Sequence, residues 1–283
     1  MIFVVIPVHN RKELTRNCLR SLVEQTFRNY KIIIIDDGST DGTGEMIESE
    51  FPEVHIIKGD GNLWWTAATN LGVEYAIRND HEINNNFVLT LNSDTVATNT
   101  LLNDLLESYN RAGRPSLVGA TAVDAQSGKV LYRGEKINWL TESSRFFFNN
   151  PNRPSNGLID VTVFPGRGLL IPFEVFKKIG VFDARNFPHY AADYDFTLKA
   201  KKSGFGLYCS WDAIVKIFPD ESGSVMLRNK KTFKNYIEHI SGKRGAAGIM
   251  IFIKYTFRHC PWYAMPFFLS IGLARRIFGY FIK

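Results

Sequence analysis

Strand-length apolar runs alternate with segments of helical periodicity along the first half of this chain. Five runs rich in β-branched or aromatic residues predict strands, over Ile2 to Val8, Lys31 to Ile35, Val54 to Lys58, Phe87 to Asn92 and Leu117 to Val123. Apolar residues at helical spacing lie between them, around Leu14 to Val23, Met46 and Ile47, Leu71 to Ile77, and Leu101 to Tyr109. This alternation predicts an α/β fold with a mostly parallel sheet and helices on both faces.

The loops at the carboxyl ends of these strands are where a ligand is expected. In open parallel sheets these loops converge at one edge, and helix N-termini there attract anions. The loops in question are Pro7 to Arg11, Asp36 to Thr43, Gly59 to Thr69 and Asn92 to Thr95.

The second half of the chain is less regular. Periodicity is lost from about residue 124 to 157, where we expect an excursion over the surface that faces an acceptor. Pattern returns with Val161 to Pro172 and a short helix around Val175 to Ile179. A loop from Gly180 to Ala192 then leads into a helix that begins near Asp193.

Two carboxylates, Asp36 and Asp37, follow the second predicted strand and precede Gly38 and Ser39. One interpretation is local, because Asp and Ser are common helix caps and Gly is a common turn residue. The position after a buried strand favours a second interpretation, in which Asp37 accepts the imide N–H of a pyrimidine base. We favour base recognition by Asp37.

The fourth predicted strand delivers Asn92, Ser93 and Asp94 at its carboxyl end. A carboxylate there can hold a hard divalent cation that takes its remaining ligands from water and substrate phosphate oxygens. The alternative is that Asp94 caps a helix starting near Asn99, although it lies several residues early for a cap. We therefore predict a Mg²⁺ or Mn²⁺ site at Asp94.

Six motifs in this order give the chain a family resemblance: PVHN, DDGSTDGT, GNLWWTAATNLG, LNSD, GRGLLIP and HYAADYDF. Over roughly residues 1–215 they resemble family 2 glycosyltransferases of the GT-A fold, and GNLWW resembles bacterial rhamnosyltransferase-like members that build surface polysaccharide. The resemblance implies that Pro7, Val8 and His9 line a nucleotide pocket, with Asp36 among the donor-binding residues, and that Asp37 reads the uracil or thymine edge. It further implies that Asn92, Ser93 and Asp94 form the metal motif, and that Asp193 is the general base.

Two residues depart from that family pattern. Ala192 replaces the Glu that usually precedes the base, and Ser93 stands where many members carry a second Asp. The first change removes a supporting carboxylate, and the second weakens the metal motif. Asp94 and Asp193 are both retained, which is compatible with activity.

Asp193 also has a physical case as the base. Inverting transfer needs one carboxylate to take the acceptor proton, and a metal-stabilised diphosphate leaves without protonation. At the start of a helix the macrodipole favours the ionised form. Asp195 would point about 200° away around the helix, so only one of the two faces the site. A plain N-cap role for Asp193 stays open.

Several neighbouring residues complete the predicted site. Asn62 and Trp64 belong to a segment whose small residues let backbone approach the diphosphate at a helix N-terminus, and Trp64 or Trp65 either stacks on the ligand or packs in the core. Arg167 contacts phosphate or is a solvated turn residue. His189 and Tyr190 shape the acceptor site or belong to a surface loop.

The C-terminal segment, residues 216–283, is basic and aromatic, and the whole chain has a net charge of +6. The segment predicts helices that either pack an apolar stripe on the main domain or contact an anionic membrane through residues 249–283. Basic and aromatic residues together suit a lipid surface at least as well as nucleic acid. Its longest charge-free stretch, Cys260 to Ala274, contains Pro261 and Pro266 and is short of the roughly 20 residues of a spanning helix.

The remaining features favour a cytoplasmic protein at the inner face of the membrane. The three cysteines show no metal-ligand spacing, and the N-terminal run lacks the features of a signal peptide. We expect donor chemistry in residues 1–123 and acceptor chemistry and catalysis in residues 124–215.

The function predicted from the resemblance is inverting transfer of a sugar, with rhamnose favoured, from a UDP- or dTDP-sugar to a glycan or lipid-linked acceptor in cell-surface polysaccharide synthesis. A sugar-phosphate nucleotidyltransferase would carry a Gly-rich loop after the first strand, which PVHNRKEL does not supply. A non-catalytic carbohydrate- or nucleotide-binding relative would have no need for Asp94 and Asp193 together.

Overall fold

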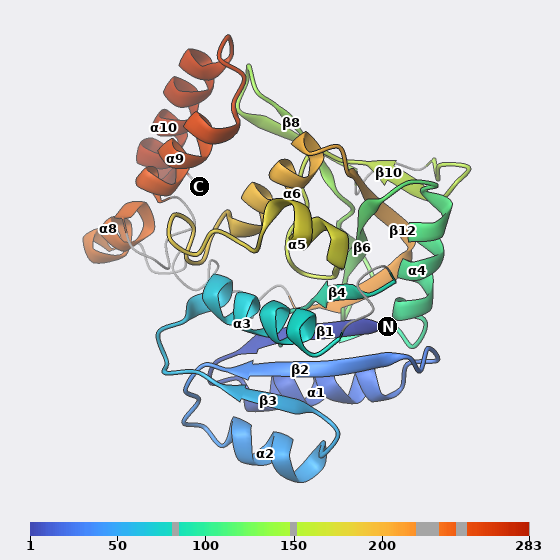
Figure 1. The fold of residues 1–283 in the computed structure, drawn as a ribbon. Coiled ribbons are helices and arrows are strands. Elements are labelled where there is room, and N and C mark those ends of the chain that lie inside the picture. The colour runs from blue at the N-terminus through green and yellow to red at the C-terminus, as the bar shows by residue number, and fades with distance from the viewer. Residues whose placement is uncertain (81–84, 148–151, 219–231, 242–247, 283) are drawn as a thin grey trace.

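The computed structural model describes residues 1–80, 85–147, 152–218, 232–241 and 248–282. Its main sheet has ten strands, of which eight follow the order β10-β12-β6-β11-β4-β1-β2-β3 (Figure 1). Helices cover both faces of this sheet, as the strand and helix alternation predicts.

The first half of the sheet is parallel. It consists of β1 (Ile2–Val8), β2 (Tyr30–Asp36), β3 (His55–Lys58) and β4 (Phe87–Thr90), with β2 and β4 on opposite sides of β1. The connecting helices are α1 (Lys12–Val23), α2 (Thr43–Glu50) and α3 (Trp64–Arg78). The sequence prediction of this half is confirmed, except that α3 begins at Trp64, within the predicted loop.

Beyond β4 the sheet is mixed. β11 (Leu169–Pro172) runs antiparallel to both β4 and β6 (Ser116–Asp124), and β12 (Gly206–Ile217) runs parallel to β6. Three short strands, β5 (Thr95–Ala97), β7 (Val130–Tyr132) and β10 (Leu158–Asp160), pair antiparallel at its margins. The predicted surface excursion also contains a separate hairpin of β8 (Glu135–Asn138) and β9 (Ser143–Phe146).

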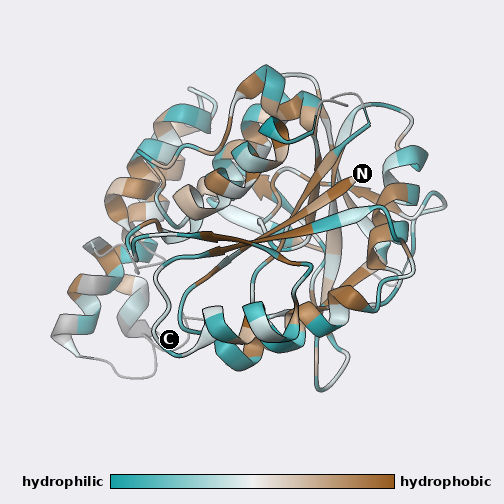
Figure 2. Cartoon of the chain, turned by 60° about the horizontal axis from the view of Figure 1, so that its bottom comes forward, coloured by the Kyte–Doolittle hydropathy of each residue, from teal (hydrophilic) through white to brown (hydrophobic). Residues whose placement is uncertain are grey.

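The core lies in two layers, one on each face of the sheet. Along β1, Ile2, Val4 and Ile6 face α1, α2 and α4 (Leu101–Arg111), while Phe3 and Val5 face the opposite layer. That layer contains α3, α5 (Phe173–Ile179) and α6 (Ala192–Lys202). Burial on both sides explains why the central strands read as continuous apolar runs, which Figure 2 shows in brown.

The C-terminal segment forms helices, as predicted: α8 (Phe233–Ser241), α9 (Ile249–His259) and α10 (Met265–Ile282). Pro261 follows the end of α9, and the two helices pack against each other. Within the described ranges, no helix is long and apolar enough to span a membrane. Six basic residues of the C-terminal segment lie outside the described residues: Arg228, Lys230, Lys231, Lys243, Arg244 and Lys283.

Candidate active site

The candidate site lies where the carboxyl ends of β1, β2 and β4 meet. After β1 the chain adds β2 and β3 on one side and then crosses to add β4 on the other. Loops that leave neighbouring strands toward opposite sides open a crevice at this switch point, which is where ligands bind in such sheets. Three of the four predicted loops follow these strands.

Asp37 anchors the loop that precedes α3. Its Oδ1 accepts the Gly61 N–H at 2.8 Å, and its Oδ2 accepts the N–H groups of Leu63 at 3.0 Å and Trp64 at 3.2 Å. The carboxylate, only 6% exposed, therefore supplies acceptors to the otherwise unpaired donors at the start of α3. This contact explains why the helix starts earlier than the sequence pattern predicts. Asp36, beside it, caps its own turn by accepting the Ser39 N–H at 3.0 Å.

The loop after β1 is tied to the loop after β2. The His9 ring nitrogen Nδ1 lies 2.6 Å from the Asp37 carbonyl oxygen, and the Thr40 N–H donates to Asn10 Oδ1 at 2.7 Å. Pro7 is half-buried and His9 is exposed, so both are accessible beside Asp37. The Val8 side chain belongs to the hydrophobic core.

Asp94 is buried between two arginines. Its Oδ2 accepts a hydrogen bond from Arg11 Nη1 at 3.1 Å and lies 3.9 Å from Arg167 Nη2. Its Oδ1 is buried and has no hydrogen-bond partner. The helix α4 begins only at Leu101 and receives no side-chain cap, so the cap interpretation of Asp94 is wrong. Arg11 was not predicted from the sequence as a partner of Asp94.

Asp193 lies on the other side of the turn that carries Arg167. Its Oδ2 accepts the Gly166 N–H at 3.0 Å, and its Oδ1 accepts the Tyr194 N–H at 2.9 Å. The helix α6 begins at Ala192 with Ala191 as its N-cap, so the N-cap interpretation of Asp193 is wrong. Ala191 adopts a left-handed conformation with φ of 66°, which is strained for a residue with a Cβ atom.

The ionisation of Asp193 differs from the expectation based on the helix dipole. Removal from water raises the pKa of this carboxyl, against the lowering effect of the backbone N–H groups of Gly166 and Tyr194. A carboxylate with a raised pKa is a stronger base once it is ionised. Asp193 as a whole residue is half-buried.

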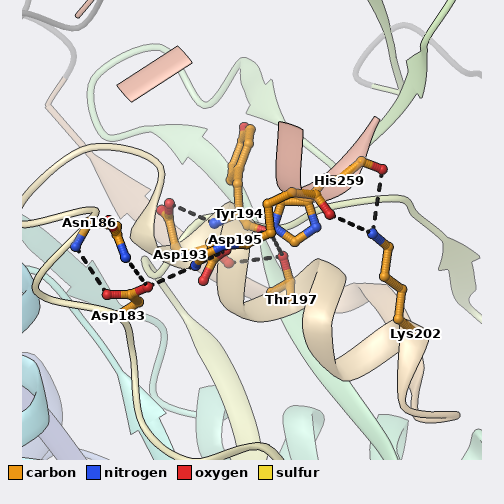
Figure 3. A network of polar contacts seen from close by, with 9 residues as sticks. Asp183, Asn186, Asp193, Tyr194, Asp195, Thr197, Lys202 and His259 are labelled. Atoms are coloured by element: carbon orange, nitrogen blue, oxygen red, sulfur yellow. Dashed lines mark hydrogen bonds and ion pairs between the residues drawn. The ribbon is translucent and has the colours of Figure 1, made fainter. Parts of the chain in front are cut away.

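Asp195 points away from the site, as the helix geometry predicts. Its Oδ1 accepts from Arg258 Nη1 at 2.9 Å and lies 2.8 Å from His259 Nε2, and the Lys202 ammonium donates to the Arg258 carbonyl oxygen at 3.1 Å. Figure 3 shows His259 beside Asp195, with Asp193 nearby on the same helix. The opposite side of α6 is therefore bonded to α9.

The two tryptophans of the GNLWW segment have different environments. Trp65 Nε1 donates to Asn92 Oδ1 at 3.0 Å, and its ring packs so closely on Gly166 that a Cβ atom there would lie 2.3 Å from it. Trp65, which is half-buried and packs against the core, therefore joins Asn92 to the Gly166 turn. Trp64 has φ of 58° and its ring contacts His189 edge-on at 5.5 Å.

The remaining predicted residues are placed as follows. Asn62 is exposed and its N–H donates to Asp60 Oδ1, so it lies at the rim of the loop. Ser93 is buried between Asn92 and Asp94. Over the described residues, no group of three or more His, Cys, Asp or Glu side chains gathers to hold a metal.

The family model described as Glycosyl transferase family 2 matches residues 3–180. An uncharacterised glycosyltransferase of Rickettsia typhi is 25% identical over 207 residues, which cover 70% of this chain and 58% of the relative. Glycosyltransferase GlyA of Streptococcus pneumoniae serotype 4 is 35% identical over 95 residues, 33% of this chain and 13% of the relative. The chain thus spans less than two thirds of either relative.

Solved structures share the fold. TarS of S. aureus (residues 1–349) in complex with UDP superposes with a TM-score of 0.58 at 14% identity, covering 98% of this chain and 72% of that one. The mannosyltransferase PcManGT of Pyrobaculum calidifontis, in complex with GDP-Man and Mn²⁺, gives 0.59 at 15% identity, covering 98% and 69%. The predicted GT-A fold is confirmed.

Proposed function

This chain belongs to glycosyl transferase family 2, and from that premise we propose that it transfers a sugar from a nucleotide-sugar donor to a hydroxyl group of a glycan or lipid-linked acceptor. The donor in this proposal is a UDP- or dTDP-sugar, with rhamnose the sugar that the GNLWW motif favours, and transfer inverts the configuration at C1. One observation carries this proposal: Asp94 and Asp193 both contact the short turn that contains Gly166 and Arg167. Asp94 lies near the Arg167 guanidinium, and Asp193 accepts a hydrogen bond from the Gly166 N–H.

Asp193 is the general base of the proposed reaction. Its carboxylate takes the proton of the acceptor hydroxyl while that oxygen attacks C1, and the diphosphate leaves without a proton. The Gly166 N–H holds one carboxylate oxygen in place. The raised pKa strengthens the base, and the positive charge of Arg167 helps to keep it ionised.

Asp94 would hold the divalent metal, Mg²⁺ or Mn²⁺. Its buried Oδ1 has no hydrogen-bond partner, and an anionic oxygen is the ligand that such hard cations prefer. When bound, the metal would neutralise the negative charge that develops on the departing diphosphate. Arg11 and Arg167, which already face Asp94, would bind the phosphates from the protein side.

The nucleotide would lie along the wall formed by the first two loops. Pro7, Val8 and His9 line it, and Asp37 is the proposed base reader, supported by Asp36. Three backbone N–H groups already bind the Asp37 carboxylate, which leaves about one of its four acceptor positions for an imide N–H. Asn62, Trp64, Asn92 and Ser93 complete the proposed donor site.

Calorimetric titration tests the donor site. Purified protein is titrated with UDP, dTDP and GDP, each with and without Mn²⁺ or Mg²⁺, alongside Asp94→Ala. Asp160→Ala is the matched control, because Asp160 is a half-exposed carboxylate paired with Lys136 and Lys201, away from the crevice. We expect metal-dependent binding of a pyrimidine diphosphate that is lost in Asp94→Ala and kept in Asp160→Ala.

Other outcomes point to other functions. Absence of binding to all three nucleotides would refute the transferase proposal and favour a non-catalytic relative. Release of pyrophosphate from a nucleoside triphosphate and a sugar phosphate would instead identify a nucleotidyltransferase.

We also propose contact with an anionic membrane surface at the inner leaflet, through α9 and α10. Six of the ten large apolar side chains exposed in the described residues lie in α9, in α10 or in the connection between them, where Trp262 is 84% exposed, and Phe257 of α9 is 64% exposed. Basic residues lie among them. Aromatic and basic side chains together suit an anionic lipid surface. Sedimentation with phosphatidylglycerol vesicles tests this: Trp262→Ser should weaken binding, and Val23→Ser, an exposed apolar residue of α1, should not. Equal sedimentation of both variants and the unmodified protein would refute it.

A further inference from the structure

A cavity of about 150 Å³ lies between the β8–β9 hairpin, the start of α6, and helices α9 and α10. Glu135, Ser144, Tyr194, Tyr255 and Phe268 are among the residues that line it. Tyr194 directly follows the proposed base. A cavity of roughly 150 Å³ is large enough for a six-membered ring of the size of benzene.

One polar group of the cavity lining, the Tyr255 hydroxyl, lacks a partner within the described residues. The Tyr255 side chain lines the cavity and is only 7% exposed. A buried hydroxyl without a partner is costly, and a ligand that offers a donor or acceptor would satisfy it. The carboxyl of Glu135, itself 3% exposed, is bonded to the hydroxyls of Tyr194 and Ser144.

The apolar part of the lining consists of aromatic rings and Ile137. Phe252 and Phe268 stack with their centroids 5.6 Å apart, and the Arg276 guanidinium lies 3.7 Å from the Phe252 centroid. Arg276 is held by Glu142, at the turn of the hairpin, at 2.9 Å. Flat apolar walls with a few convergent hydroxyl and carboxyl groups suit a ligand that has both C–H faces and hydroxyl groups, as a sugar ring does.

The position of the cavity ties it to the reaction. Tyr194, which lines the cavity, is the residue next to Asp193 in the chain. The negative charge of Asp193 raises the pKa of Glu135 and of Tyr255, two other residues of the lining. We propose that this cavity is an acceptor subsite, which binds one sugar ring of a glycan acceptor through hydrogen bonds to Tyr255 and Glu135. This assignment rests on the proposed glycosyl transfer.

Saturation-transfer NMR with simple sugars tests the subsite. The probes are the methyl α- and β-glycosides of glucose, galactose, mannose, rhamnose and N-acetylglucosamine, measured with UDP and Mn²⁺ present. Tyr255→Phe removes only the unpartnered hydroxyl, so its thermal unfolding temperature should be unchanged or raised. Tyr208→Phe is the matched control. Tyr208 lies on β12, its hydroxyl accepts a hydrogen bond from Arg114 Nε at 3.2 Å, and it does not line the cavity.

We expect at least one glycoside to bind the unmodified protein, about tenfold more weakly to Tyr255→Phe, and unchanged to Tyr208→Phe. Equal binding to both variants would overturn the assignment. Absence of any glycoside signal from protein that binds UDP would overturn the subsite alone. Glycoside binding by protein that binds no nucleotide would refute the proposed function and the acceptor assignment with it.

Discussion

Glu135 makes the stability of this protein depend on pH in a predictable direction. Burial raises the pKa of its carboxyl from 4.5 to about 7; hydrogen bonds from Tyr194 and Ser144 oppose the rise, and the charge of Asp193 adds to it. The titratable groups near it are Asp193, Glu142 and Arg276, together with the tyrosines Tyr132, Tyr194 and Tyr255, whose pKa values burial raises above 10. Between pH 4.5 and 7 the carboxyl therefore keeps its proton in the folded state.

The sign follows from proton linkage. In that pH range the unfolded chain has released the proton, so the folded state binds more protons and the free energy of unfolding falls as pH rises. The stabilising contribution is complete below pH 4.5 and is lost as pH rises through about 7. The pKa difference, about 7 minus 4.5, is about 2.5 units, which corresponds to about 3 kcal/mol.

Glu135→Gln removes this titration while it keeps the size of the side chain. Urea unfolding at pH 4.5, 6, 7 and 8 should show the stability of the variant rising relative to the unmodified protein, by about 3 kcal/mol in total across the series. Glu53→Gln, an exposed position, is the control and should run parallel to the unmodified protein. Parallel curves for Glu135→Gln would refute the reasoning.

Three further predictions follow from the site and its supports. Asp193→Asn should lower transfer about 10²- to 10⁴-fold with an unchanged affinity for UDP, measured by product formation and calorimetry, and full activity would exclude Asp193 as the base. Asp195→Ala should lower the free energy of unfolding by about 3 kcal/mol, because Asp195 is buried with two partners. Asp160→Ala, at an exposed ion pair, should lower it by at most about 1 kcal/mol. Equal losses of the two variants in urea unfolding would contradict this prediction. Gly166→Ala should cost about 1–3 kcal/mol and displace Trp65, seen as a change in the part of the tryptophan fluorescence that Trp65→Phe removes. Gly279→Ala, where a Cβ atom meets nothing within 4 Å, should change stability by about 1 kcal/mol or less. An unaltered contribution of Trp65 to the fluorescence would count against the packing argument.

The parallel half of the fold was predictable because its signals are local. Each of β1, β2 and β4 is buried on both faces, so its sequence is a continuous apolar run. The loops that follow these strands supply Asp37 and Asp94, and the rule that ligands bind at carboxyl strand ends selects them without further information. The contacts of these side chains, such as Arg11 with Asp94, depend on how loops far apart in sequence meet.

The second half depends on long-range pairing, which the sequence pattern does not display. β12 was not predicted, because its register on β6 shifts between Ser210 and Ile214 and the bulge breaks the alternation of apolar residues. The cavity beside Glu135 is formed by β8, α6, α9 and α10, which lie more than a hundred residues apart at the extremes. The periodicity of a short sequence window cannot predict contacts between segments so far apart in the chain.

The helix α6 joins the candidate site to the C-terminal helices. Asp193 on one side accepts the Gly166 N–H, and Asp195 on the other accepts from Arg258 and His259 of α9. Without α9, the buried Asp195 would lose both partners, and Tyr255 would no longer close the cavity beside Tyr194. We therefore propose that the predicted domain boundary near residue 215 marks only a change in composition. In this proposal the C-terminal helices belong to the same folded unit as residues 1–215 and support Asp193, the proposed base.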